Sequence, residues 1–300
     1  MSAEPLVSVV TAAYNMAQYV RQAVDSVLAQ DGPALEVIVV DDGSTDDTAQ
    51  ALAAYADEPR VRVIRQANAG QTKAKNAGLR AARGEYVGFC DADNAWRPGK
   101  LSRQLALLRA NPAVGVIYGD VALIGPAGEP LPTPPVKRWS GRITGRLLAD
   151  NFVTFNTTFV PRRVLEEFGG FDESLRMAID YDLWLRVSTK YDFLHVPEPF
   201  VDYRIWGGQM SHRTGERLDS YFRLLERFLE RYPDSVTRAD VARAYAHTYV
   251  TRGIWRATLG ERAAAWRDLR LACGRRPLDA RLWRTAAALA LGRLGPRSVA

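Results

Sequence analysis

Short apolar runs and amphipathic segments alternate along the first 125 residues of the chain. The apolar runs are rich in β-branched and aromatic residues, which is typical of buried strands. They span Val7–Val10, Glu36–Val40, Val61–Ile64, Tyr86–Cys90 and Val114–Ile124. Between them, apolar residues recur three and four positions apart, as in helices with one buried side. This alternation predicts an α/β fold with a mostly parallel sheet and helices on both of its faces.

The pattern changes after residue 125. Residues 125–140 are rich in proline and glycine, which predicts a loop. Over residues 141–212 the pattern is mixed again, with a strand expected at 152–160 and a helix expected at 181–187. We expect these residues to complete the domain that the first 125 residues begin.

From residue 213 the apolar periodicity is helical only. The expected helices cover residues 218–232, 238–258, 261–273 and 278–291. We therefore expect one domain over residues 1–212, with halves 1–125 and 141–212, followed by a helical extension over residues 213–300.

The composition is that of an ordinary folded protein. Of the 300 residues, 47% are hydrophobic and 25% are charged, which excludes a disordered or collagen-like chain. The two cysteines, Cys90 and Cys273, exclude a disulfide scaffold and favour a reducing compartment. The amino terminus lacks the pattern of a signal peptide, and no apolar run reaches the ~18–20 residues of a membrane-spanning helix. We therefore expect a cytoplasmic protein.

The net charge of +6 is unevenly distributed along the chain. Residues 1–212 carry 22 basic and 25 acidic side chains, whereas residues 213–300 carry 18 arginines and 9 acidic side chains. The basic helices predict a peripheral contact with anionic lipids at the inner face of the plasma membrane. The alternative is a solvated helical surface. No recognition motif accompanies the charge, so nucleic acid is not an expected partner.

Polar side chains follow the ends of several predicted strands. The carboxyl ends of parallel strands meet at one edge of a sheet, which is where such sheets bind ligands. Asp91 and Asp93 follow one strand closely, and a divalent cation relieves the repulsion between two such carboxylates. Mg²⁺ or Mn²⁺ would also bind phosphate oxygens, so the pair indicates a diphosphate ligand. Tyr14 and Asp42 suit stacking on a base and accepting hydrogen bonds from a nucleoside.

Each of these signals also has a structural alternative. Taken alone, residues 42–46 favour a turn followed by a capped helix, and Asp91 and Asp93 are also compatible with simple loop carboxylates. No glycine-rich dinucleotide motif and no P-loop motif follows any predicted strand. A metal ion would therefore have to replace backbone amides in holding the phosphates.

Several short segments, taken together and in order, resemble one enzyme family. They are Val7-Ser-Val-Val-Thr-Ala-Ala-Tyr14-Asn15, Val40-Asp-Asp-Gly-Ser-Thr-Asp46, Asn76-Ala-Gly78, Gly84-Glu-Tyr86, Asp91-Ala-Asp93, Gly169-Gly-Phe-Asp-Glu173, Asp180-Tyr-Asp-Leu-Trp-Leu-Arg186 and Tyr203-Arg204. This series resembles the inverting family 2 glycosyltransferases, which have the GT-A fold. The resemblance covers about residues 6–212. It implies a nucleotide-binding first half and an acceptor-binding second half.

The resemblance implies roles for five residues in binding the nucleotide sugar. Ala12, Tyr14 and Asp42 would line the nucleoside, with Asp42 accepting a hydrogen bond from the base. Lys73 would approach the diphosphate, and Asp91 would face the ribose.

The resemblance also implies a metal site and a catalytic base. Asp93 would bind Mn²⁺ or Mg²⁺ between the phosphates. Trp206 stands where the family often has a histidine, so His212 is the candidate substitute ligand, with a surface loop histidine as the alternative. Asp180 falls where the family places its base. It would take a proton from an acceptor hydroxyl whose oxygen attacks C1 of the sugar, and the configuration at C1 would invert.

Three residues of the second half are candidates for acceptor contacts. Asn156 and Thr157 would bind the acceptor, although polar residues at a strand edge are the alternative. Arg186 would orient a carboxylate or a phosphate. The chain departs from the family pattern at Asn94, where aspartate is usual, and at Ile179, where glutamate is usual.

The implied reaction moves a sugar from a nucleotide-diphosphate sugar, most often a UDP-sugar, to a hydroxyl-bearing glycan, lipid-linked or other acceptor. Polysaccharide, cell-envelope glycan or glycoconjugate biosynthesis would be the setting. The departures at Asn94 and Ile179 leave a second hypothesis, a catalytically degenerate nucleotide-sugar-binding or scaffold protein of a glycan assembly complex. A sugar-1-phosphate nucleotidyltransferase would need a basic glycine-rich loop after the first strand, and residues 11–15 do not provide one.

Overall fold

The computed structural model describes residues 7–209 and 213–295 and divides the chain into two compact units. The first unit comprises Met1–Ile143 and Phe152–Gly207, and the second comprises Thr144–Asn151 and Gly208–Ala300. Among the helices of the described residues, none has the length and apolar character needed to span a bilayer.

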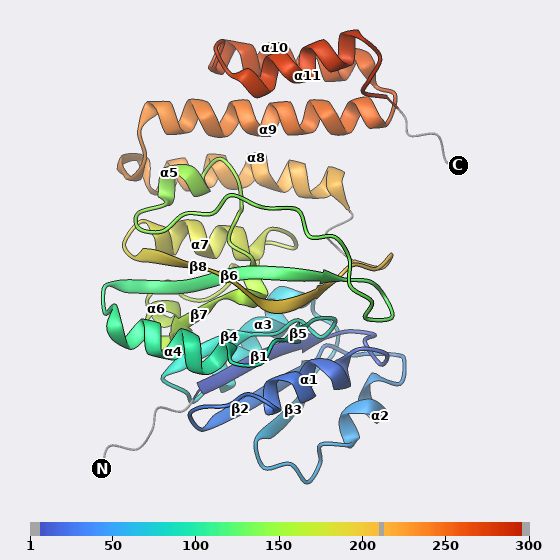
Figure 1. The fold of residues 1–300 in the computed structure, drawn as a ribbon, viewed down its shortest axis with the longest axis vertical. Coiled ribbons are helices and arrows are strands. Elements are labelled where there is room, and N and C mark those ends of the chain that lie inside the picture. The colour runs from blue at the N-terminus through green and yellow to red at the C-terminus, as the bar shows by residue number, and fades with distance from the viewer. Residues whose placement is uncertain (1–6, 210–212, 296–300) are drawn as a thin grey trace. The chain divides into compact units, whose positions relative to one another are not determined.

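A mixed sheet of eight strands forms the centre of the first unit (Figure 1). The strands are β1 (Val7–Ala13), β2 (Leu35–Asp41), β3 (Val61–Arg65), β4 (Tyr86–Phe89), β5 (Ala95–Trp96), β6 (Val114–Ile124), β7 (Phe159–Pro161) and β8 (Asp192–Arg204). Their order across the sheet is β3-β2-β1-β4-β7-β6-β8-β5. The first four strands are parallel, and β7 is antiparallel to both β4 and β6. Because β8 is parallel to β6, the carboxyl ends of β1, β2, β4, β6 and β8 all lie at one edge.

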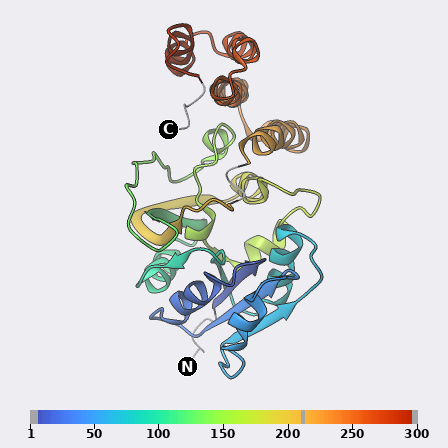
Figure 2. The same ribbon diagram turned by 90° about the vertical axis from the view of Figure 1, so that its right-hand side faces the viewer.

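Helices cover both faces of this sheet, as the sequence predicts (Figure 2). They are α1 (Val20–Leu28), α2 (Thr48–Ala53), α3 (Gln71–Ala81), α4 (Lys100–Ala110), α6 (Arg162–Glu167) and α7 (Ile179–Ser188). Alternate residues of β2 point to opposite faces. Val37 and Val39 belong to the core cluster that contains α1, whereas Ile38 and Val40 pack against Ala74 of α3. The predicted α/β architecture is therefore confirmed.

The strand predicted at residues 152–160 is wrong over most of its length. Phe155–Thr157 form a 3-10 turn, and only Phe159–Pro161 pair as a strand. The hydroxyl groups of Thr157 and Thr158 donate to backbone carbonyls three residues earlier, at 2.6 and 2.7 Å. Such local side-chain bonds compete with strand pairing and stabilise the turn.

The sequence pattern does not reveal β8, although it is 13 residues long. Pro197 and Pro199 interrupt the segment, and proline is rare inside a strand. In the structure these prolines lie at an irregularity, where the partner of β6 shifts from Val196 to Pro199 and then to Val201. The irregularity lets the strand continue past the prolines.

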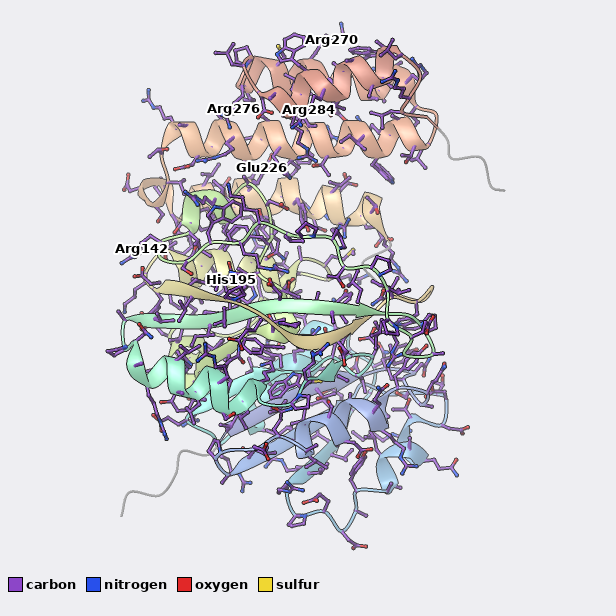
Figure 3. The ribbon with its side chains drawn as sticks, viewed as in Figure 1. Arg142, His195, Glu226, Arg270, Arg276 and Arg284 are labelled. Atoms are coloured by element: carbon purple, nitrogen blue, oxygen red, sulfur yellow. The ribbon has the colours of Figure 1, made fainter. Side chains whose placement is uncertain are left out.

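The predicted loop at residues 125–140 contains no helix or regular strand. Its end is anchored to the sheet by Arg138, whose Nε donates to Asp120 Oδ1 of β6 at 2.6 Å. His195 of β8, labelled in Figure 3, places its Nε2 3.0 Å from the same oxygen. The amide of His195 also donates to Ser140 Oγ at 2.9 Å, so the end of the loop is bound to both β6 and β8.

The second unit consists of helices. They are α5 (Thr144–Leu147), α8 (Thr214–Arg231), α9 (Arg238–Thr258), α10 (Arg262–Arg275) and α11 (Ala280–Ala290), which confirms the helices predicted after residue 213. This unit has a core of its own, made of Ala246, Val250, Ala257, Ala265, Leu269, Ala272, Leu282 and Leu289. Asp268 is fully buried and accepts hydrogen bonds from Arg252 and Arg256 of α9, which joins α10 to α9.

The short helix α5 belongs to the second unit, although the sequence places it inside the predicted catalytic domain. Gly145 of α5 lies so close to α9 that a Cβ atom there would be 2.4 Å from Cγ of Asp240. Farther along α9, His247 Nε2 lies 3.9 Å from Asp150 Oδ1. The structural division at Gly207 lies near the domain boundary predicted at residue 212, and the functional halves remain predictions.

Candidate functional site

The polar residues that follow β1, β2 and β4 come together at one edge of the sheet. Ala13 at the end of β1 lies opposite Asp41 at the end of β2, and the amide of Asp42 donates to the carbonyl of Ala13 at 2.9 Å. On the other side of β1, Val10 lies opposite Phe89, shortly before Asp91. The predicted convergence of strand ends is therefore present.

Asp42 is buried and organises the loop that leads into α3. Its Oδ1 accepts from Gln66 Nε2 at 2.7 Å and from the amide of Ala69 at 2.9 Å. Its Oδ2 accepts from the amide of Gly70, the residue before α3, at 2.8 Å. A carboxylate has about four acceptor positions, so Asp42 retains capacity for a further donor. Its role toward a base remains a prediction.

The Tyr14 ring is 44% exposed at the tip of the loop after β1, and Ala12 is half-buried at the end of that strand. The next residue, Asn15, has a positive φ of 54°. Its Oδ1 accepts from the amide of Thr45 at 2.8 Å, which ties the loops after β1 and β2 together. An exposed ring on a fixed loop suits stacking, as predicted for Tyr14.

Asp91 is held by two residues from other elements. Lys75 Nζ of α3 lies 2.8 Å from Asp91 Oδ1, and Asn156 Nδ2 donates to Oδ2 at 2.8 Å. Asn156 also accepts from the Asp91 amide at 2.6 Å, so its amide group binds the backbone and the side chain together. Lys75 Nζ lies 4.1 Å from the centre of the Phe155 ring, a favourable cation–π distance. These contacts fix the orientation of the Asp91 carboxylate.

Lys73 is the predicted diphosphate contact, and Lys75 is not among the residues that the sequence predicts for the site. In the structure the Lys73 side chain is exposed on α3, whereas the Lys75 side chain is only 8% exposed and pairs with Asp91. The helical spacing could have indicated that Lys75 is buried. It lies three positions after Thr72 and three before Gly78, and both of these residues are on the buried side of α3. Lys73 remains a predicted diphosphate contact.

The proposed acceptor residues of the 3-10 turn are buried. Asn156 is engaged with Asp91, while the Thr157 hydroxyl donates to the carbonyl of Thr154 and accepts from the amide of Gly119 at 3.2 Å. These contacts support neighbouring elements. A role for either residue in binding the acceptor remains a prediction.

Asp93 accepts a hydrogen bond on each carboxylate oxygen. Asn94 Nδ2 donates to Oδ1 and Trp206 Nε1 donates to Oδ2, both at 2.9 Å. The buried Asn94 also accepts from the amide of Arg204 at 2.9 Å. The side chain of an aspartate at position 94 would have no N–H group to donate, so the asparagine side chain gives Asp93 a donor that an aspartate would lack. Asn94 and Trp206 therefore orient Asp93.

The Asp93 carboxylate fits a hard divalent cation. Mg²⁺ is usually held by one or two carboxylates together with phosphate oxygens of the substrate, and carboxylate oxygen also suits Mn²⁺. Asp91 is already neutralised by Lys75, which leaves Asp93 as the candidate ligand of the pair. Within residues 7–209 and 213–295 there is no group of three or more metal-ligating side chains, so phosphate and water would complete the coordination. His212 lies outside the described residues.

Asp180, the predicted base, is half-buried in the first turn of α7. Ala178 precedes the helix with a positive φ of 57°, and its carbonyl accepts from the amide of Asp182. Arg186 anchors α7, because its guanidinium donates to Asp182 Oδ2 and to the carbonyl of Gly170, both at 2.8 Å. Arg186 is buried in these contacts. Its role in orienting a carboxylate or a phosphate of a ligand remains a prediction.

Helix α3 also holds the segment that leads to Asp180. Asn76 Nδ2 donates to the carbonyl of Phe171 at 2.8 Å and its Oδ1 accepts from the amide of Phe171 at 3.0 Å. One turn earlier, the Thr72 hydroxyl donates to the carbonyl of Leu175 at 2.7 Å. The two sequence motifs that contain Asn76 and Phe171 are therefore joined in space. The same helix positions Asp91 through Lys75.

Comparison with known proteins identifies the family of this chain. Residues 8–158, half of the chain, match the sequence family described as Glycosyl transferase family 2. The chain belongs to this family. An uncharacterized glycosyltransferase of Rickettsia prowazekii is 33% identical over 236 residues, which cover 76% of this glycosyltransferase and 72% of the relative.

Two relatives of this glycosyltransferase are polysaccharide synthases. A chondroitin synthase of Escherichia coli is 31% identical over 233 residues, and a hyaluronan synthase of Pasteurella multocida is 29% identical over 233 residues. Both matches cover 76% of this chain, but only 33% and 23% of the respective synthase. The chain therefore corresponds to one part of these longer enzymes.

Solved structures of the same fold confirm the predicted GT-A architecture. Residues 1–349 of S. aureus TarS in complex with UDP-GlcNAc have a TM-score of 0.70 at 19% identity, over 96% of this chain and 87% of that one. The mannosyltransferase PcManGT of Pyrobaculum calidifontis, in complex with GDP-Man and Mn²⁺, has a TM-score of 0.65 at 22% identity, over 97% and 80%.

Proposed function

We propose that this glycosyltransferase moves a sugar from a nucleotide-diphosphate sugar to a hydroxyl group of a glycan or lipid-linked acceptor, with inversion at C1. One observation carries the proposal. Helix α3 holds Asp91 through Lys75 and, through Asn76, the segment that leads to Asp180, so that donor and acceptor functions share one support. A UDP-sugar is the favoured donor, because two TarS structures are complexes with UDP-GlcNAc and with UDP, although PcManGT is in complex with GDP-Man.

The residues at the sheet edge would bind the donor. The exposed Tyr14 ring would stack on the base beside Ala12, and Asp42 would accept a hydrogen bond from the base. Asp91, oriented by Lys75 and Asn156, would accept from ribose hydroxyl groups. This would favour ligands that carry ribose hydroxyl groups, because a ligand without them would leave the Asp91 carboxylate without those hydrogen bonds, which costs binding free energy.

Asp93 would hold Mn²⁺ or Mg²⁺ together with the diphosphate, with Asn94 and Trp206 fixing the direction of its oxygens. A bound divalent ion would neutralise charge on the departing diphosphate. Lys73 on the first turn of α3 would approach the same phosphates from the solvent side.

Asp180 would act as the general base in a single displacement. Its carboxylate would take the proton of the acceptor hydroxyl as the oxygen bonds to C1, while the bond from C1 to the diphosphate oxygen breaks. The nucleoside diphosphate leaves from the opposite face, so the configuration at C1 inverts.

Chondroitin and hyaluronan synthases among the relatives favour a sugar hydroxyl as acceptor. The free cysteines Cys90 and Cys273 suit a cytoplasmic location.

A screen of nucleotide-sugar donors by mass spectrometry, with Mn²⁺ present, tests the reaction. We expect release of the nucleoside diphosphate with one donor class and a product of inverted anomeric configuration. Asp180→Asn should abolish transfer and preserve nucleotide binding, while Asp31→Asn at a distant exposed position should change neither.

The metal role has a separate test. Asp93→Ala should reduce turnover strongly and abolish its dependence on Mn²⁺, and full turnover in this variant would refute the role. Calorimetric binding of UDP with no transfer or hydrolysis for any donor would instead favour the degenerate binding protein.

A further inference from the structure

Helix α11 exposes an apolar stripe along one side. Its exposed positions are Ala280, Trp283, Arg284, Ala287 and Ala290, which recur at helical spacing, and Leu291 directly after the helix is exposed as well. The opposite side packs Leu282 and Leu289 into the core of the second unit. Trp283 is 56% exposed and Leu291 is 67% exposed. The exposed side of α11 is therefore apolar except for Arg284.

The turn between α10 and α11 continues this stripe. Leu278 in the turn is 95% exposed. Trp283 Nε1 donates to the carbonyl of Pro277 at 2.6 Å, so the indole ring lies against the same turn. The side chains form what we call the α11 surface, which consists of Leu278, Trp283, Ala287, Ala290 and Leu291.

Arginines border the α11 surface. Arg275 and Arg276 immediately precede the turn, and Arg284 lies within the stripe; Figure 3 labels Arg276 and Arg284. Residues 275–284 contain four arginines and one acidic residue, Asp279. The Asp279 carboxylate is occupied in capping α11, where it accepts from two backbone amides, and it lies 3.8 Å from Arg276. The border of the surface is therefore positively charged.

We propose that the α11 surface docks on the headgroup region of an anionic lipid bilayer. The helix would lie along the membrane interface, with Leu278 and Trp283 entering the boundary between headgroups and acyl chains. Arg276 and Arg284 would bind lipid phosphates. A helix with apolar side chains outward and a cationic border has the composition of an interfacial helix. The proposal does not depend on the identity of the sugar donor.

Shape and charge favour a bilayer over a protein partner. Leu278 projects from a turn, and a bilayer accommodates a projecting side chain without a preformed pocket. A symmetric contact with a second copy of the chain would place the arginines of two α11 surfaces against one another, and like charges at an interface are unfavourable. An anionic lipid surface satisfies both the arginines and the apolar side chains.

Flotation of the full chain with lipid vesicles tests the proposal. We expect binding to vesicles that contain phosphatidylglycerol, weak binding to phosphatidylcholine alone, and release at high salt. Arg276→Gln and Arg284→Gln should each weaken binding about fivefold, which corresponds to ~1 kcal/mol for each basic residue near such a surface. Leu278→Ser and Trp283→Ala should each weaken it about tenfold, because each removes buried apolar area.

Two matched variants control for general effects. Leu259→Ser removes a leucine that is 53% exposed at the end of α9, and Arg109→Gln removes an exposed arginine of the first unit. Both should bind vesicles like the original chain, and thermal unfolding should show that all variants fold. Absence of binding to phosphatidylglycerol vesicles, or equal losses in the controls, would overturn the proposal. Self-association that Trp283→Ala abolishes, without vesicle binding, would identify a second copy as the occupant instead.

Discussion

Lys73 and Lys75 lie two positions apart on α3 and differ in burial. Lys75 is buried against Phe155 and paired with Asp91, whereas Lys73 is exposed. We expect Lys75→Met to weaken UDP binding by about tenfold or more, because a hydrogen bond to a charged group contributes ~1.5–3 kcal/mol and Asp91 loses its orientation. It should also lower the midpoint of thermal unfolding. Calorimetric titration with UDP measures the affinity.

The variant Lys73→Met is the matched control for this pair. It should leave the unfolding midpoint unchanged, since the side chain is exposed. A loss of UDP affinity in Lys73→Met would support its predicted contact with the diphosphate. If only Lys73→Met weakens binding, the positioning role of Lys75 is wrong.

Lys100 is a second buried lysine, and it makes stability depend on pH. Its Nζ donates to Gln104 Oε1 at 2.7 Å and lies 3.8 Å from the Trp96 ring centre. Burial lowers the pKa of Lys100 to about 7, whereas an unfolded lysine titrates near ~10.4. Between these values the unfolded state binds more protons, so the free energy of unfolding rises with pH. Below pH ~7 Lys100 is protonated in both states, so its contribution to the free energy of unfolding no longer changes with pH.

We therefore expect the free energy of unfolding to increase by about 2 kcal/mol from pH 7 to pH 9 through Lys100 alone. In Lys100→Met this part of the slope should vanish, while Lys137→Met, at an exposed position, should keep it. Urea unfolding at several pH values measures the effect. The same pH slope in Lys100→Met and the original chain would mean that Lys100 is not the source.

The position of single residues was predictable where they follow a strand, and their contacts were unpredictable where the partner comes from a distant part of the chain. Asp42, Asp91 and Asp93 could be selected because strand ends converge on one sheet edge. Nothing local indicates that Asn156, 65 positions away, binds Asp91. The donor role of Asn94 was likewise hidden, since the sequence shows only the loss of a carboxylate.

At the scale of elements, α3 connects the two sides of the proposed reaction. Asn76→Ala removes both hydrogen bonds to the backbone of Phe171 and leaves those groups without partners. We expect a loss of ~1–3 kcal/mol in the free energy of unfolding. We also expect a lower kcat, because the segment that leads to Asp180 loses a support. Urea unfolding and turnover measured on the same preparation give both values.

Gln71→Ala provides the control for this prediction. Its Nε2 bonds the carbonyl of Arg176 at 3.2 Å in an exposed position, so its removal should change both quantities little. If Asn76→Ala loses stability but keeps its kcat, α3 supports the fold alone and not the position of Asp180.

Elements with a clear period were predictable, and those shaped by distant pairing were not. The helices after residue 213 and the first four strands follow from apolar spacing. The segment 152–160 alternates like a strand, but its threonine hydroxyls bond locally and form a turn. The strand β8 contains prolines, and pairing with β6 around an irregularity overrides that local preference.

At the scale of the whole molecule, each unit has a core of its own. The second unit depends on Asp268, which binds Arg252 and Arg256. Asp268→Asn removes a buried negative charge between two arginines, and we expect a loss of ~3–5 kcal/mol in the stability of this unit. Because the proposed donor site lies in the first unit, UDP affinity should change less than about twofold.

Differential scanning calorimetry and UDP titration together test this independence, with Asp234→Asn at an exposed position as the control. We expect one unfolding transition of Asp268→Asn to move to lower temperature and the other to stay. Parallel loss of UDP binding would show that the first unit does not fold without the second. The change in apolar period after residue 212 indicates where the helices begin. It gives no sign that residues 144–151 belong to the second unit, because that placement depends on packing against α9.

That placement changes how the helical unit can be exchanged between related enzymes. A helical unit that simply follows a domain is joined to it by one peptide segment, so one junction in the sequence is enough to replace it with the unit of a related enzyme. Here the chain passes between the units after Ile143, after Asn151 and after Gly207. A chimaera made with one junction near residue 207 would pair α5 of one parent with α9 of another, so that Gly145 and Asp240 come from different sequences. A successful graft therefore needs three junctions, with α5 travelling together with the helices that it packs against.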